Sequence, residues 1–161
     1  MQRYDDCPQI LREFLIYHEN IKGQSRLTIS EYYLDLRMFL RFVMLMRNDM
    51  PITTRLEDID IKKVDIGFIR EIDTSDIFDF LSYLANERTA NPDSPAPEYG
   101  IGASSRARKL SAIKSFYKYL TIRTKQLQEN PVAESFLARL EAPIPYSGAE
   151  ESGLAVRSLA R

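Results

Sequence analysis

Side chains that commonly carry catalysis or bind metals are scarce in this sequence. The 161 residues include one histidine, His18, and one cysteine, Cys7. Two such residues supply neither a Cys/His metal cage nor a paired-histidine active site. His18 falls in the apolar stripe of residues 8–22, so we expect a core histidine with a local hydrogen bond. Cys7 cannot form an internal disulfide, and no role is expected for it; an intracellular, cytoplasmic location follows as the default.

Three acids, Glu57, Asp58 and Asp60, lie close together in an irregular stretch. Carboxylates can bind metals or transfer protons, but no histidine or glycine-rich loop accompanies these three, so we expect a solvated surface. The chain also lacks a Gly-x-Gly-x-x-Gly fingerprint, a Walker-type phosphate loop and a Gly-x-Ser-x-Gly elbow. The sequence therefore predicts no catalytic residue, no metal, no cofactor and no small-molecule substrate.

Charge is unevenly distributed along the chain. The net charge is −1, but residues 49–79 carry nine acids against four bases, whereas residues 104–125 carry seven bases and no acid. A basic segment on a nearly neutral chain indicates one side that faces a polyanion.

Hydrophobic periodicity predicts four helices. They span residues 8–22, about 28–47 with Ser25 or Thr28 as N-cap, about 74–88 with Asp73 or Thr74 as N-cap, and about 104–126. Residues 48–72 look irregular, and their alternating apolar positions leave a short strand and an extended arm equally open. Proline and glycine make residues 89–102 a loop. We expect an all-α fold, a small four-helix bundle with an irregular C-terminal tail.

The outer faces of the second and fourth helices mix long cations with short hydroxyls. This mixture suits a helix lying against a phosphate backbone, since cations meet phosphates and small donors fit where the backbone comes close. For the second helix alone, a solvated face is the simpler explanation. In the fourth, seven bases without an acid forgo the i,i+4 ion pairs of an ordinary solvated helix. The candidate DNA-contacting residues are Arg26, Ser30, Tyr33, Arg37, Arg41, Arg106, Arg108, Lys109, Ser111, Lys114, Ser115 and Lys118.

The fourth helix also carries a family resemblance. Residues 105–120 (SRARKLSAIKSFYKYL), followed by Glu129-Asn130-Pro131-Val132, resemble the end of the N-terminal core-binding domain of Xer-type tyrosine recombinases and phage integrases. Phe14-Leu15, residues 25–42 and residues 77–84 agree in order and spacing, so the resemblance covers about residues 5–133.

The resemblance implies a SAM-like four-helix domain that forms half of a clamp around double-stranded DNA, with the second and fourth helices toward the duplex. In the family a separate C-terminal domain holds the arginine, lysine and histidine set that activates a phosphate for attack by tyrosine.

From the resemblance we expect a core-binding domain over residues 1–133 and a linker or weakly ordered tail over 134–161. We also expect a fragment or truncated product that ends before the catalytic domain and is not itself an enzyme. The expected partners are duplex DNA and other recombinase subunits, and no membrane. The alternative is a helical protein-interaction module that pairs with an intact recombinase without binding DNA.

Overall fold

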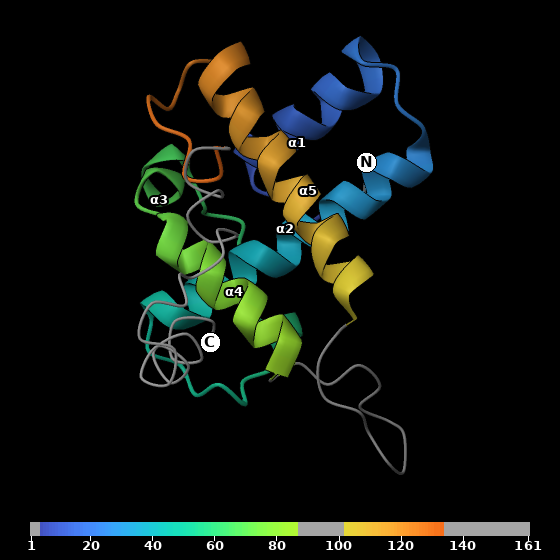
Figure 1. The fold of residues 1–161 in the computed structure, drawn as a ribbon. Helices are drawn as coiled ribbons and strands as arrows, with labels where there is room; N and C mark the ends of the chain where they lie inside the picture. The colour runs from blue at the N-terminus through green and yellow to red at the C-terminus, as the bar shows by residue number, and fades with distance from the viewer. Residues whose placement is uncertain (1–3, 87–101, 134–161) are drawn as a thin grey trace, which may run out of the picture.

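A computed structural model describes residues 4–86 and 102–133, and all regular elements of this part are helical. The α-helices are α1 (Gln9–Ile16), α2 (Arg26–Arg47), α3 (Ile66–Arg70), α4 (Thr74–Asn86) and α5 (Ala103–Lys118) (Figure 1). Two π-helical turns, η2 (Tyr17–Ile21) and η4 (Tyr119–Arg123), extend α1 and α5, and η3 (Leu56–Asp58) is a 3-10 turn. The predicted all-α fold is confirmed.

Side-chain caps fix where α2 and α4 begin. Ser25 Oγ accepts a hydrogen bond from the Thr28 N–H at 3.2 Å, so α2 begins at Arg26, two residues before the predicted start. Asp73 and Asp76 each accept a bond from the other's backbone N–H, both at 3.0 Å. This reciprocal pair has the form of a capping box and holds the start of α4.

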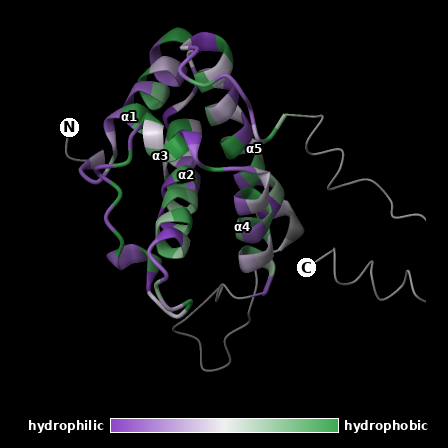
Figure 2. Cartoon of the chain, turned by 90° about the vertical axis from the view of Figure 1, so that its left-hand side faces the viewer, coloured by the Kyte–Doolittle hydropathy of each residue, from purple (hydrophilic) through white to green (hydrophobic). Residues whose placement is uncertain are grey.

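The α2 helix occupies the centre of the domain. In Figure 2 it lies between α1 on one side and α4 with α5 on the other. Ile29, Leu36, Phe39 and Val43 are buried as predicted, and Tyr32 is partly buried, but Met46 is 45% exposed. Leu40, Phe42 and Leu45 are buried as well. The predicted stripe was too narrow because a helix covered from several directions buries more than one face.

The irregular stretch after α2 is an arm and contains no strand. Its alternating residues Ile59, Ile61 and Val64 are all buried, and the arm includes η3 and the short α3. Asp65 caps α3 by accepting a bond from the Phe68 N–H at 3.0 Å. The apolar alternation therefore comes from a loop that packs against the helices, not from a sheet.

The inner face of α5 and of its extension η4 agrees with the prediction. Ile113, Phe116, Tyr117 and Leu120 have no exposed surface. Phe116 packs edge-on against Phe14 of α1, with ring centroids 5.3 Å apart. This contact fixes which side of α5 remains for solvent and ligands. Residues 89–101 of the predicted loop, and the predicted tail and domain boundary after residue 133, lie outside the described residues.

Candidate nucleic-acid interface

His18 is a packed core residue, as predicted. Its side chain is buried, and its Nδ1 lies 2.9 Å from Gln24 Oε1. Because an amide oxygen can only accept, Nδ1 is the protonated nitrogen. Burial lowers the pKa of His18, and the charge of Lys22 lowers it further, while the Gln24 bond acts in the opposite direction.

The other candidates for chemistry also have ordinary environments. Cys7 is a buried free thiol, and burial raises its pKa to about 11. Glu57, Asp58 and Asp60 are exposed, as expected for a solvated surface. Among the residues that the structure describes, no three His, Cys, Asp or Glu side chains gather in a way that could hold a metal ion.

Asp6 ties three of the predicted DNA-contacting residues to the N-terminal segment. Its carboxylate accepts hydrogen bonds from the Tyr33 hydroxyl, from Arg37 Nη1 at 3.3 Å and from Arg41 Nη2 at 3.0 Å. The Tyr4 ring also covers Tyr33, with centroids 4.6 Å apart.

This contact corrects the predicted outer stripe of α2. Tyr33 is 4% exposed, and the side chain of Arg41 is 12% exposed. The N-terminal segment covers the part of α2 that helical geometry alone assigns to solvent. Periodicity within one helix carries no information about a segment that crosses it from elsewhere in the chain.

Asp35 joins α2 to the basic segment of α5. It is 2% exposed and accepts from Arg108 Nε at 3.1 Å, from Arg108 Nη2 at 3.0 Å and from Lys109 Nζ at 2.8 Å. Lys109 is buried as well, so its ammonium serves this internal pair and is not presented on the surface, contrary to the prediction. Arg108 differs, since half of its side chain is exposed. The Asp35 bond and charge raise its pKa, so the guanidinium stays charged.

The remaining candidates lie at the surface. Arg26, Ser111 and Lys118 are exposed, whereas Ser30, Arg106, Lys114 and Ser115 are partly exposed. Together with Arg108, the residues Ser111, Lys114, Ser115 and Lys118 form the outer arc of α5, on the side opposite Phe116 and Tyr117. We call these five residues the α5 arc. The fold leaves this part of the predicted interface accessible.

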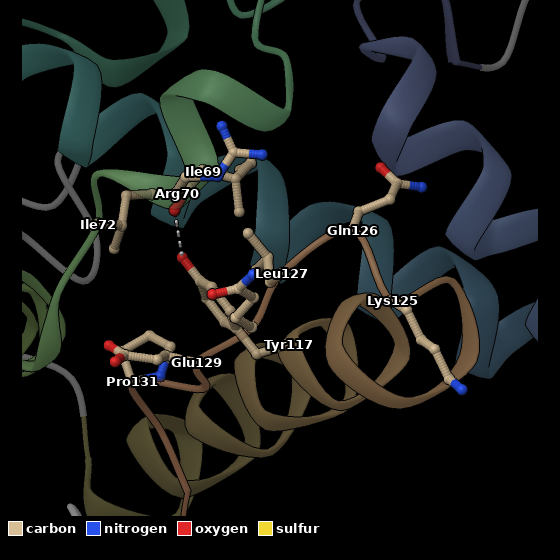
Figure 3. A pocket seen from close by; sticks show the side chains of 10 residues that line it. Ile69, Arg70, Ile72, Tyr117, Lys125, Gln126, Leu127, Glu129 and Pro131 are labelled. Atoms are coloured by element: carbon tan, nitrogen blue, oxygen red, sulfur yellow. Dashed lines mark hydrogen bonds between the residues drawn. The ribbon is translucent and has the colours of Figure 1, made fainter.

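A hollow of about 480 Å³ lies between α3 and the segment after η4. Figure 3 shows Tyr117 reaching from α5 toward the backbone of α3, where its hydroxyl donates to the Ile69 carbonyl at 3.4 Å. Burial strongly raises the pKa of Tyr117, so the phenol stays protonated. Lys125 points away from the phenol in the same view. The hollow borders residues 125–131, not the α5 arc.

Sequence reasoning missed the two acids that organise these cations. Asp35 shares its side of α2 with Tyr32, Met38 and Phe39, and a carboxylate among such side chains signals an internal ion pair, because a buried charge must be paired. Asp6 gave no such signal, since the residues around it have no periodicity. Lys22, Gln24 and Arg123, which line a second hollow described below, were also not among the candidates.

Comparison of the sequence with known proteins finds a matching domain family and similar recombinases. Residues 54–124 match the family described as phage integrase, N-terminal SAM-like domain. The tyrosine recombinase XerC of Caldanaerobacter subterraneus subsp. tengcongensis is 36% identical over 153 residues, which cover 94% of this chain and 40% of that protein. XerC of Chlorobaculum tepidum is 28% identical, covering 88% of this chain and 34% of the relative. XerD of Shewanella oneidensis is 27% identical, covering 93% and 39%.

The chain thus spans between 34% and 40% of the length of these three relatives. No solved structure matches it significantly. Within the described ranges, none of the helices is long and apolar enough to cross a bilayer. The all-helical fold, the matched family and the recombinase relatives agree with the resemblance found in the fourth predicted helix. Residues 54–124 thus match the SAM-like domain found at the N-terminus of phage integrases, and the chain is similar to the N-terminal part of Xer tyrosine recombinases.

Proposed function

We propose that this domain binds duplex DNA at a recombination site, as the core-binding part of a tyrosine recombinase. The observation that carries the proposal is the α5 arc, where cations and short hydroxyls share the one side of α5 that the core does not use. The recombinase relatives support it as well. Lysines on such an arc meet phosphates as point charges, and serines donate where the backbone approaches closely.

Arg108 is a cation of the arc that the domain itself holds in place. Asp35 engages its Nε and Nη2, which leaves Nη1 without a partner among the described residues. A guanidinium held from one side loses little further side-chain freedom when it binds a phosphate or a guanine edge. Arg37 is the second candidate for a guanine edge, but Asp6 already engages its Nη1 and its side chain is 28% exposed. Arg108 is therefore the stronger choice.

Charge reversal on α5 tests the proposal. The variant Lys114→Glu, Lys118→Glu is compared with Lys62→Glu, Lys63→Glu, which changes the same charge at two exposed positions in the arm before α3. Binding to a labelled duplex is followed by fluorescence anisotropy at several low salt concentrations. Affinity of the parent should fall steeply with salt, because each neutralised phosphate releases counterions. The α5 variant should bind much more weakly than the control variant at every salt concentration. Equal affinity of parent and α5 variant, with both folded, would exclude α5 as the DNA face.

We also propose that the chain does not cleave DNA by itself. Its one histidine is buried with its Nδ1 bonded to Gln24, and the activating set of the family uses more than one histidine, so this chain does not assemble that set. Supercoiled plasmid incubated with the purified chain should stay supercoiled and yield no covalent phosphotyrosine adduct on a denaturing gel. An adduct would refute this part of the proposal.

The alternative function is pairing with other recombinase subunits without contact to DNA. Two apolar side chains on α2 favour it, since Leu27 is 70% and Leu34 is 49% exposed. A chain that acts only in this way shows no salt-dependent binding to duplex DNA, so the titration above separates the two functions.

A further inference from the structure

The second hollow, with a volume of about 280 Å³, lies where the two π-helical turns meet. Tyr17 of η2 and Tyr119 of η4 both line it, and their ring centroids are 5.1 Å apart. Single π-helical turns within helices occur frequently at functional sites. Here both of them contribute to one surface feature.

The lining of this hollow is strongly positive. Lys22 follows η2, Lys118 ends α5 and Arg123 ends η4, and the ten lining residues include no carboxylate. The Arg123 guanidinium lies over the Tyr17 ring, with Cζ 5.8 Å from the centroid, which restricts where its charge can lie. Three cations surround this one hollow, so an anion in it is attracted by all three. The Tyr17 ring meanwhile holds the Arg123 guanidinium in place.

Gln24 adds a neutral donor whose orientation is fixed. Its Oε1 accepts a hydrogen bond from His18 Nδ1. This bond fixes the side-chain amide and therefore also the direction of its NH₂ group. That NH₂ has no protein partner in the described part of the chain. Ser115 adds a hydroxyl to the lining. The hollow therefore combines charges with short donors, which is the donor set that phosphate oxygens require.

We propose that this hollow binds one phosphate group. Ser115 and Lys118 belong both to the hollow and to the α5 arc, so a DNA strand along the arc reaches it. The inference rests on the proposed function for its source of phosphate, a phosphodiester of the duplex. The volume of about 280 Å³ falls just below the roughly 300–1,000 Å³ typical of pockets for small-molecule ligands. Inorganic phosphate shares the chemistry and is the second possible source.

The salt dependence of DNA binding tests whether the three cations share one phosphate. The slope of log Kobs against log salt is about −0.9 for each phosphate neutralised. The triple variant Lys22→Gln, Lys118→Gln, Arg123→Gln should therefore reduce the magnitude of the slope by about 1, since only one phosphate contact is lost. The control variant, with the exposed cations Lys62, Lys63 and Arg70 changed to Gln, loses the same charge elsewhere and should keep the parental slope.

Other slopes would overturn the proposed phosphate site, while the proposed binding of the domain to duplex DNA would still stand. A reduction of about 3 would show that each cation contacts a phosphate of its own. No reduction, with the parent still binding the duplex, would show that the hollow stays outside the contact.

If the parent binds no duplex, the proposed function is refuted. A titration with inorganic phosphate then tests the hollow separately. NMR then follows the Gln24 side-chain amide. A shift that saturates in the parent and disappears in the triple variant would support the hollow as a site for free phosphate. No shift would overturn the inference.

Discussion

Replacement of Asp35 tests the buried ion pair that joins α2 to α5. The variant Asp35→Leu leaves the buried Lys109 ammonium without its counter-charge, since the Nζ to Oδ1 bond of 2.8 Å is the ion pair that the structure shows for it. Removing one partner of a buried pair costs about 3 to 5 kcal/mol. Arg108 adds little, because half of its side chain is exposed and surface pairs contribute about 0 to 1 kcal/mol.

The assay is urea unfolding followed by circular dichroism, with a thermal scan beside it. For a chain of this length, 1 kcal/mol corresponds to about 2 to 4 °C in Tm, so Asp35→Leu should lower the Tm by about 6 to 20 °C. Lys109→Met alone should cost less, because Arg108 still neutralises Asp35. The double variant Asp35→Leu, Lys109→Met should recover most of the loss, since apolar residues often replace a buried pair at no cost.

The reasoning fails if Asp35→Leu destabilises the domain by less than about 1 kcal/mol, the range of an exposed pair. It also fails if the double variant is no more stable than Asp35→Leu. In either case the Lys109 ammonium is hydrated in the variant, and the ion pair with Lys109 is not the reason why Asp35 is buried.

Three further predictions concern the core and its titrating groups. The pKa of His18 is lower in the folded chain than its ordinary value of 6.5, so the unfolded chain binds the proton more readily, and stability should fall as pH drops below about 6.5. His18→Gln should remove this dependence between pH 7.5 and 5.5, measured as Tm against pH, and an unchanged profile would contradict the assignment. Burial raises the pKa of Cys7 from 9.0 to about 11, so its thiolate fraction at pH 8, and its rate of alkylation, should be about 100-fold lower folded than unfolded. Phe116→Ala should cost about 3 to 5 kcal/mol and Leu36→Ala about 2 to 5, whereas Met46→Ala at an exposed position should cost about 0.5 or less; similar losses in urea unfolding for all three would mean that the core is misassigned.

Much of the local structure could be predicted because its causes are local. The caps at Ser25 and Asp73 act within three residues of the helix starts that they fix. The inner stripe of α5 follows from a 3.6-residue period, and Phe116 and Tyr117 are buried as that period requires. The basic character of α5 is a property of composition, so the sequence alone indicated which helix offers cations to a polyanion.

The identity of the accessible cations depended on contacts between distant residues. Asp6 lies 27 residues from Tyr33, and Asp35 lies 73 residues from Arg108. No window along the chain includes both partners of such a pair, so a helical wheel counts Tyr33 among surface residues and does not show which acid pairs with Lys109. The hollow between η2 and η4 likewise exists only after α1 and α5 pack together. Composition and periodicity thus determined the fold class and the charged helix, whereas tertiary packing decided which charges are used inside the domain and which remain for a ligand, because burial and pairing are properties of residues far apart in the chain.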